Sequence, residues 1–343
     1  MMLRKQLFVA TVIFSSMTAA GAAHARDVIQ LAGSSTVLPF ASIVAEEFNH
    51  AHPEFKTPVV GSGGTGGGLR QFCQGIGFNT TDIANASRSI SQKELEACHN
   101  QGVKNVIEIQ FGYDGIVFAS PKGQPEFALT AADIYSASAA KVLIDGQWVT
   151  NPYTEWSQIN QNLPQQEIML VVPASNHGTR EVFEEKLLVP GCDSFEPVKA
   201  LPKEEKISYC TTLRSDGRVI EVAGDYTETL TRLNVQPEAI GVFGLGFYEQ
   251  NRDRLQVATI ENIAPSLETI ASGAYPVSRP LYFYVKGEHL EIIPGLTEYV
   301  DFFLTPEVSG LGGPLEEIGL IPLSDDERHT IQTRFKTQAL AKQ

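Results

Sequence analysis

The chain contains 343 residues, which is enough for two domains that each bury a core of their own. Apolar residues make up 43% of it and charged residues 19%, a composition typical of globular proteins rather than of disordered or fibrous chains. Its 26 basic and 40 acidic side chains give a net charge of −14, which argues against nucleic acid as a partner, because binding to nucleic-acid phosphates needs a basic surface.

Residues 1–25 have the three-part pattern of a secretory signal peptide. Arg4 and Lys5 are followed by the mostly apolar stretch 7–17 and then by small residues that end in Ala-His-Ala at 23–25. This pattern predicts cleavage after Ala25 and export of the mature chain to the periplasm, with an uncleaved N-terminal anchor as the alternative. The apolar stretch is short for a membrane-spanning helix and is interrupted by Ser and Thr.

Short apolar strands alternate with amphipathic helices through most of the mature chain. This alternation predicts an α/β fold. The predicted strands are 28–32, 57–60, 82–86, 106–109, 115–119, 168–172 and 281–285, and the predicted helices begin near residues 37, 69 and 179. No linker separates two domains in the sequence, which suggests that the chain crosses between them more than once.

A polar turn, Gly33-Ser34-Ser35-Thr36, joins the first strand to the first helix. Ser and Thr are common helix N-caps, but capping needs one hydroxyl and this turn offers three. The start of a helix also suits an anion, because its backbone N–H groups and the positive end of the helix dipole face the ligand. The turn therefore predicts either a simple cap or part of an anion site that works against the negative charge of the whole chain.

The second strand runs into a glycine-rich stretch, Gly61 to Gly68, interrupted only by Ser62 and Thr65. So many glycines predict a backbone with positive φ angles or a close approach to another group. The stretch contains G-x-G-x-x-G, which is typical of dinucleotide-binding folds, but it follows the second strand rather than the first, and an exported chain meets little NAD. No Lys-Ser or Lys-Thr follows, as a P-loop requires. A turn that binds an anion is the favoured interpretation.

Two further segments carry arginine where a strand gives way to a helix. Ser87 and Arg88 follow the third strand, and Asn176-His177-Gly178-Thr179-Arg180 opens the helix 181–188. Arginine is well suited to bidentate recognition of phosphate or carboxylate, although a lone arginine at a strand end is more often solvated or salt-bridged. Because ligands of open α/β sheets bind at the edge where strands end, the four segments together predict one anion site.

The four cysteines, at positions 73, 98, 192 and 210, fit no C-x-x-C metal or redox pattern. An even number of cysteines in an exported chain favours disulfide bonds. Short loops are the easiest to close, so we predict the pairs Cys73–Cys98 and Cys192–Cys210, with the other two connectivities still open. Neither a G-x-S-x-G elbow nor an H-E-x-x-H motif occurs, so the sequence favours a protein that is not an enzyme and that needs no cofactor or metal.

These segments, in this order and over nearly the whole mature chain, resemble the PstS phosphate-binding proteins of ABC phosphate importers. The resemblance extends to Tyr113-Asp114-Gly115 and to the stretches 239–244 and 275–281. It implies a two-lobed periplasmic binding protein of type II, in which each lobe is a mixed sheet flanked by helices and a hinge joins the lobes. We expect lobe I to comprise residues 26–112 and 255–343, and lobe II residues 113–254. The resemblance also implies a monomer that captures inorganic phosphate between the lobes and delivers it to an ABC permease of the inner membrane.

The resemblance implies a ligand set of hydroxyl, backbone and guanidinium donors from both lobes: Ser35, Thr36, Thr65, Ser87 and Arg88 on one side, and His177, Gly178, Thr179 and Arg180 on the other. The chain departs from the family at two of these positions. His177 stands where many members have Ser, and Arg88 stands where the best-studied members have the Asp that accepts the phosphate proton. We expect Asp114 either to accept that proton instead or only to orient Arg88.

Two other functions stay open on the sequence alone. Binding of another tetrahedral oxyanion, sulfate or an oxometallate, would use the same donors. An exported phosphatase would need a nucleophile with a base or a pair of metal ions, and the sequence shows no such set.

Overall fold

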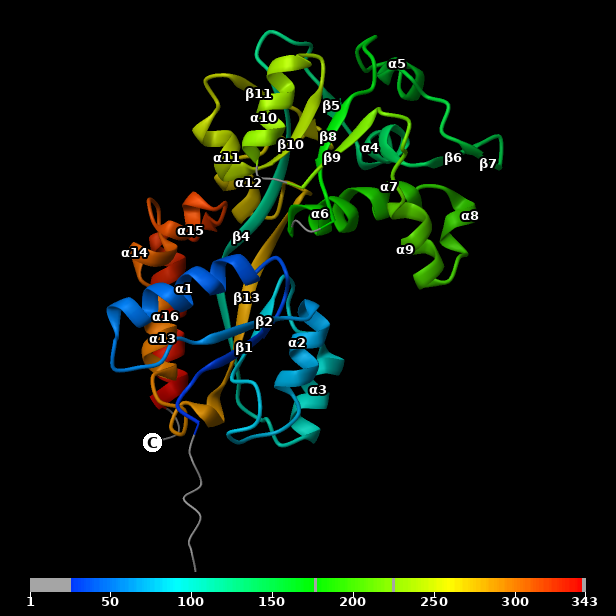
Figure 1. The fold of residues 1–343 in the computed structure, drawn as a ribbon. Helices are drawn as coiled ribbons and strands as arrows, with labels where there is room; N and C mark the ends of the chain where they lie inside the picture. The colour runs from blue at the N-terminus through cyan, green and yellow to red at the C-terminus, as the bar shows by residue number, and fades with distance from the viewer. Residues whose placement is uncertain (1–25, 176–177, 224–225, 341–343) are drawn as a thin grey trace, which may run out of the picture.

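The computed structural model describes residues 26–175, 178–223 and 226–340, which form two lobes (Figure 1). The predicted signal peptide and His177 lie outside the described residues. The blue, cyan, orange and red segments make up one lobe, and the green and yellow segments make up the other. The predicted two-lobed α/β fold is thus confirmed. In the described ranges, no helix has both the length and the apolar character needed to cross a membrane.

Two strands lead from one lobe into the other, β4 (Val106–Pro121) and β13 (Ser278–Lys286). At about 3.3 Å per residue, the 16 residues of β4 span about 53 Å. Its residues 106–115 pair antiparallel with β13, and Ile116–Ala119 pair antiparallel with β10 (Ile240–Gly244). A continuous sheet therefore joins the lobes, and β4 changes partner between Gly115 and Ile116.

The sequence predicts two strands, 106–109 and 115–119, where the structure has β4 alone. Gly112 and the polar pair Tyr113-Asp114 interrupt the apolar pattern, but their backbone groups pair with β13 on one side. On the other side, Gly112 and Tyr113 pair with β14 (Ile321–Pro322). Strand propensity depends strongly on context in any sheet, and here the pairing on both edges outweighs the low propensity of these residues.

Lobe I is a sheet with helices on both of its faces, made from the two ends of the described chain. Besides part of β4 and β13, it contains β1 (Gln30–Gly33), α1 (Leu38–Ala51), β2 (Val59–Ser62), α2 (Gly64–Phe72), β3 (Ile83–Ala86), α3 (Gln92–Asn100), the 3-10 helix Gly287–His289, α13 (Leu296–Phe303), α14 (Pro306–Ser309), α15 (Pro314–Glu317), β14 and α16 (Asp325–Leu340). β1 lies between β2 and β3 and is parallel to both, as expected where helices supply the crossovers. β13 then joins β3 in the antiparallel sense.

Lobe II repeats this plan with other segments. Besides the rest of β4 and β10, it contains β5 (Ala128–Leu129), α4 (Ala131–Ser138), β6 (Lys141–Ile144), β7 (Gln147–Thr150), α5 (Trp156–Ile159), β8 (Leu170–Pro173), α6 (Gly178–Phe183), the π-helix Glu184–Leu188, α7 (Val189–Asp193), α8 (Glu196–Lys199), α9 (Lys203–Thr211), β9 (Val219–Val222), α10 (Tyr226–Val235), α11 (Leu245–Gln250), β11 (Leu255–Val257), β12 (Thr259–Ile260) and α12 (Leu267–Ala271). β8 is parallel to both β9 and β10.

The first two strands after residue 254, β11 and β12, pair with elements of lobe II. β11 pairs with the last residues of β4, and β12 pairs with β5. We therefore propose that lobe II extends to about residue 277, where β13 begins, rather than to residue 254 as expected from the sequence.

Two glycines allow close packing in lobe I, Gly68 between α2 and β1 and Gly33 between β1 and β3. A Cβ atom on Gly68 would lie 2.3 Å from the Cα atom of Gly33, and a Cβ atom on Gly33 would lie 2.1 Å from the carbonyl oxygen of Asn85. Gly33 also has a φ of +148°, which favours glycine. The predicted glycine-rich turn is correspondingly short: β2 continues to Ser62 and α2 begins at Gly64.

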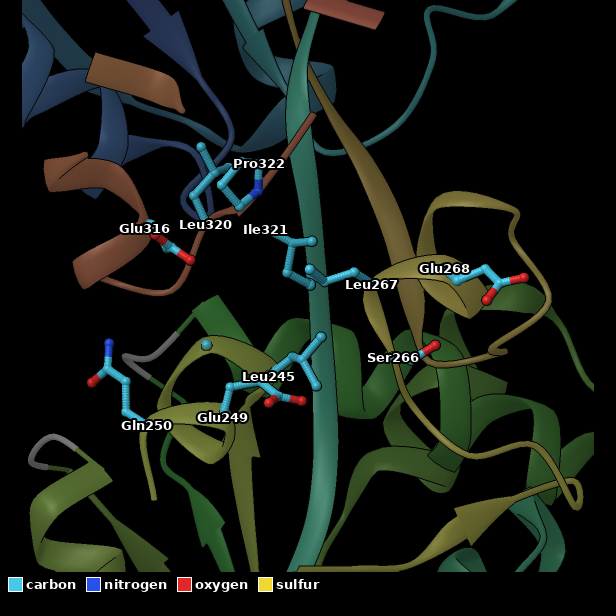
Figure 2. Close-up of a pocket in the computed structure, with 11 residues that line it drawn as sticks. Leu245, Glu249, Gln250, Ser266, Leu267, Glu268, Glu316, Leu320, Ile321 and Pro322 are labelled. Atoms are coloured by element: carbon cyan, nitrogen blue, oxygen red, sulfur yellow. The ribbon is translucent and has the colours of Figure 1, made fainter. Parts of the chain in front are cut away.

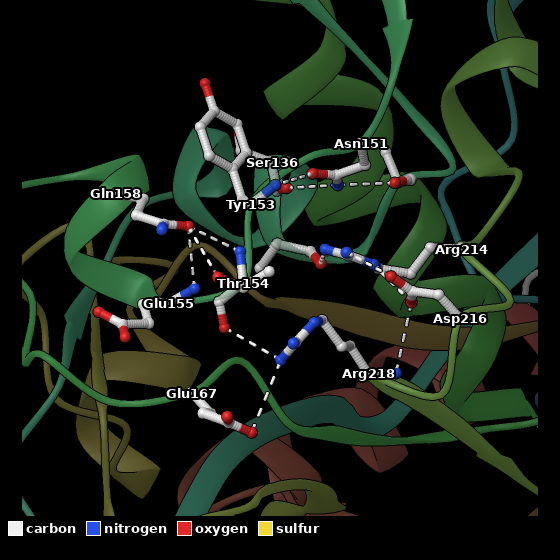
Figure 3. A network of polar contacts seen from close by, with 12 residues as sticks. Ser136, Asn151, Tyr153, Thr154, Glu155, Gln158, Glu167, Arg214, Asp216 and Arg218 are labelled. Carbon is white, nitrogen blue, oxygen red and sulfur yellow. Dashed lines mark hydrogen bonds and ion pairs between the residues drawn. The ribbon is translucent and has the colours of Figure 1, made fainter.

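A polar network fixes the outer part of lobe II (Figure 3). Arg214 is buried and donates to both carboxylate oxygens of Asp216, at 2.9 and 2.6 Å, and these hydrogen bonds lower the pKa of Asp216. Arg218 donates to the carbonyl oxygen of Thr154 and lies 3.8 Å from Glu167. These two arginines therefore hold segments of one lobe together.

Both predicted disulfide bonds are confirmed. Cys73–Cys98 joins the end of α2 to α3 in lobe I, and Cys192–Cys210 joins α7 to α9 in lobe II. Each pair lies in a small apolar cluster separate from the main core. Because each bond stays within one lobe, neither restricts the position of one lobe relative to the other.

Replacing Cys192 and Cys210 together by Ala should lower the free energy of unfolding by about 3 kcal/mol, because the bond closes a loop with a sequence separation of 18. Denaturant titration of the oxidised proteins measures this loss. The Cys73→Ala/Cys98→Ala double variant is a comparison with a separation of 25 and should lose a similar amount. Losses near zero in both variants would show that the bonds do not stabilise the lobes.

Candidate functional site

A small cavity of about 70 Å³ lies between the lobes. This volume is enough for about two water molecules, or for one small polyatomic ion. Its lining comes from lobe I (Thr36, Pro39, Phe40, Ile318 and Gly319), from lobe II (Thr179, Tyr226 and Gly244) and from β4 (Asp114). Three residues that the sequence predicts as ligands, Thr36, Asp114 and Thr179, thus meet at one cavity although they are far apart in the chain.

Arg279, at the start of β13, is not itself a lining residue but brings a positive charge into contact with two of them, Thr36 and Asp114. Its side chain is 3% exposed, and Nη2 donates to Thr36 Oγ1 at 2.7 Å. Arg279 is also the register partner of Asp114 in the ladder between β13 and β4, and its Nε lies 3.5 Å from Asp114 Oδ2. Sequence analysis assigns no role to Arg279, although the residue lies in the stretch 275–281 that resembles the family. The only sequence feature that points to it is an arginine close to the predicted strand 281–285.

Asp114 keeps an unused acceptor beside this arginine. Its side chain is 13% exposed, and within the described residues neither Asp114 Oδ2 nor Arg279 Nε has a hydrogen-bond partner. Burial raises the pKa of Asp114, while the charge of Arg279 lowers it and that of Glu181 raises it further. A buried carboxylate oxygen with no donor is suited to accept a proton that a ligand carries.

Two glutamates of lobe II contact Arg279 from the opposite side. Glu181 Oε2 accepts a hydrogen bond from Thr36 Oγ1 at 2.7 Å and lies 3.4 Å from Arg279 Nη2. Glu185 Oε2 accepts a hydrogen bond from Arg279 Nη1 at 2.9 Å. These residues come from α6 and the π-helix that follows it, so this segment of lobe II reaches Thr36 of lobe I.

Thr179 and Tyr226 add two hydroxyl groups from lobe II. Thr179 lies in the first turn of α6, and its Oγ1 is 2.5 Å from the hydroxyl of Tyr226. Burial raises the pKa of Tyr226, so its phenol stays protonated at neutral pH and can donate a hydrogen bond. No sequence pattern singles out Tyr226, so its place at the cavity could not be predicted from the sequence.

The predicted residues near β3 form a separate group. Thr65 Oγ1 lies 3.2 Å from Ser87 Oγ and accepts a hydrogen bond from the Ser87 backbone N–H at 3.1 Å, and both residues are buried. Ser35 is exposed in the turn that follows β1, and Gly178 begins α6. None of these four residues is among those that line the 70 Å³ cavity.

Ser34 and Asn85, which the sequence does not single out as ligands, have buried polar atoms at the ends of β1 and β3. The backbone N–H of Ser34 donates to the carbonyl oxygen of Asn85 at 2.9 Å, so the two residues are neighbours. Among the described residues, Ser34 Oγ and the Nδ2 and Oδ1 atoms of Asn85 have no hydrogen-bond partner. Unpaired buried polar atoms cost free energy, so these atoms are candidates to bind a ligand or water.

The two arginines predicted as ligands are engaged with carboxylates of their own lobes. Arg88, whose side chain is 45% exposed, makes two hydrogen bonds of 2.9 Å to Glu94 and holds the pKa of Glu94 at about 2. Arg180 is buried and donates to Glu184 at 2.7 Å and to Glu221 at 2.6 Å. Neither arginine lines the cavity.

A larger cavity of about 560 Å³ has a different character (Figure 2). Its lining includes the apolar residues Leu245, Leu267 and Leu320 and the carboxylates of Glu249, Glu268 and Glu316. Because no arginine or lysine is among its described lining residues, it does not suit an anion. As for metals, no three His, Cys, Asp or Glu side chains of the described ranges converge as possible ligands.

Comparisons with known proteins place this chain in a family. The family model of the PBP superfamily domain matches residues 18–307. Protein SphX of Synechocystis sp. is 30% identical over 87% of this chain and 79% of its own length. The phosphate-binding protein PstS of Staphylococcus epidermidis is 29% identical over 84% of this chain and 77% of its own length. The crystal structure of a possible phosphate-binding protein from Planctomyces limnophilus covers 91% of this chain and 98% of its own, with a TM-score of 0.70 and 27% identity.

Asp114→Asn should stabilise the protein at neutral pH and lose this effect in acid. Because burial raises the folded-state pKa of Asp114 above its unfolded value, ionising it costs stability as the pH rises through the folded pKa. Below the unfolded pKa, the carboxyl is protonated in both states and the cost is absent. Thermal unfolding between about pH 3 and pH 8 measures the difference, with the exposed Asp253→Asn as the control for the loss of one charge. A variant less stable than the wild type at pH 7 would mean that the pairing with Arg279 outweighs the cost of burial.

Proposed function

The chain belongs to the PBP superfamily and is PstS-like, and we propose that it captures inorganic phosphate in the 70 Å³ cavity between its lobes. The observation that carries this proposal is the buried pair of Arg279 and Asp114 at the cavity. A guanidinium binds the oxygens of an oxyanion, and an unused carboxylate oxygen accepts a proton. Hydrogen phosphate offers oxygens for the guanidinium and a proton for the carboxylate, whereas sulfate at neutral pH carries no proton.

We propose that the ligand shell combines residues of both lobes with the crossing strands. Thr36, Asp114, Thr179, Tyr226 and Arg279 would form its centre, since they line the cavity or contact a residue that does. We propose that the remaining predicted donors contact the ligand as well: Ser35, Thr65, Ser87 and Arg88 from lobe I, and His177 and Gly178 from lobe II when the lobes close. Arg180 donates to two glutamates of its own lobe, so we assign it the role of positioning α6 and leave the contact with the anion to Arg279.

Capture by this site would need no covalent chemistry. A small dianion gives up its hydration shell on entering the cavity and regains hydrogen bonds from guanidinium, hydroxyl and backbone N–H donors. Because the donors come from both lobes, the ligand stabilises the closed arrangement by its higher affinity for it. We propose that the mature chain works in the periplasm as a monomer and that its loaded form delivers phosphate to an ABC permease.

Sulfate or an oxometallate is the alternative ligand, and calorimetry on the phosphate-stripped mature protein separates the two. We expect phosphate to bind and sulfate to bind far more weakly at pH 7.5. Asp114→Asn should lower the affinity for phosphate at least about tenfold, because one charge-assisted hydrogen bond is lost. The same variant should leave the affinity for sulfate unchanged or higher. Equal binding of the two anions by the wild type, or no binding of phosphate, would refute the proposed function.

A further inference from the structure

We propose that Glu181 and Glu185 occupy the place of the anion and act as an internal competitor for it, so that both carboxylates must leave Arg279 before a dianion binds. This proposal rests on the proposed function of the site. It adds an explanation of what sets the affinity for the anion and of which charge state of the anion binds. Its basis is the set of contacts that the two glutamates make with the donors of the cavity.

The two carboxylates take the hydrogen bonds that an oxyanion would take. Glu181 Oε2 accepts from the hydroxyl of Thr36, which lines the cavity, and lies near Arg279 Nη2. Glu185 Oε2 accepts from the other terminal nitrogen, Nη1. Carboxylate and phosphate oxygens bind the guanidinium fork in the same way. A ligand oxygen and these carboxylates therefore exclude each other.

The two glutamates together carry the same charge as a dianionic ligand. Glu181 and Glu185 together bring two negative charges to a guanidinium that is also paired with Asp114. A dianion that joined them would add two more beside one buried arginine, where repulsion is poorly screened. A dianion that replaced them would leave the local charge unchanged. The site is therefore matched to a tetrahedral dianion that enters by exchange.

The exposed fractions of the side chains distinguish the two glutamates, which can leave Arg279, from Asp114, which stays beside it. The side chains of Glu181 and Glu185 are 44% and 50% exposed, so water can hydrate either carboxylate when a ligand takes its place at Arg279. Asp114 is 13% exposed and is fixed by the register of β4 and β13.

The test is calorimetry with phosphate and with sulfate on the mature wild type, Glu181→Gln and Glu181→Gln/Glu185→Gln. We expect Glu181→Gln to raise the affinity for phosphate about tenfold and the double variant to raise it further. Sulfate affinity should rise by a similar factor, because the competition depends on charge and not on the ligand proton. Glu196→Gln removes one negative charge from an 83%-exposed side chain of α8 in the same lobe and should change neither affinity more than about twofold.

A second substitution, Glu181→Ala, removes the acceptor of the Thr36 hydroxyl altogether and should act in the same direction as Glu181→Gln. Thermal unfolding confirms that each variant folds. Phosphate affinity that is unchanged in Glu181→Gln and Glu181→Ala, while the wild type binds phosphate, overturns this inference and leaves the proposed function standing. Weaker phosphate binding with unchanged sulfate binding overturns it as well, because Glu181 would then accept the ligand proton. Failure of the wild type and all variants to bind either anion overturns the proposed function itself, and the inference with it.

Discussion

The buried guanidinium of Arg279 is the constraint on which the interlobe region depends. A charge at 3% exposure is tolerated only when other groups compensate it, and its nearest fixed partner, Asp114, is 3.5 Å away without a hydrogen bond. The remaining partners come from Thr36 in lobe I and from Glu181 and Glu185 in lobe II. The lobes are thus held near each other by acceptors that gather around one cation, and any anion that binds here takes part in the same balance.

The continuous sheet explains how such a site can open and close without losing its centre. β4 exchanges β13 for β10 as its partner directly after Gly115, so Asp114 is one residue from the point where the lobes separate. A rotation of the lobes about this point moves Asp114 and Arg279 little. It moves α6 and Tyr226 much more, because they belong to lobe II alone. Since each disulfide bond lies within one lobe, both bonds stiffen the lobes without restricting this motion.

Local sequence patterns predict those parts of the site that local structure determines. Thr36 and Thr179 sit between a strand and a helix, and that pattern is readable in a short window, as is the α/β alternation itself. The pairing of Asp114 with Arg279 depends on the register of two strands more than 160 residues apart, which no window contains. For the same reason, sequence could not tell that Arg180 contacts Glu221 of β9 while Arg279 contacts Thr36 and Asp114, which line the cavity. It also could not show that Gly68 serves the contact of α2 with Gly33 rather than an open turn.

Several buried polar groups of lobe I and β4 make little sense as contributions to folding alone. Asp114 has a pKa raised by burial, and three polar atoms of Ser34 and Asn85 are buried near the ends of β1 and β3 without partners among the described residues. In the outer part of lobe II, by contrast, the buried Arg214 is satisfied by Asp216 through two good hydrogen bonds. A protein retains unpaired buried groups where binding later compensates them. The cost of burying Asp114 beside Arg279 is therefore a physical reason for the proposed binding of an anion between the lobes of this acidic protein.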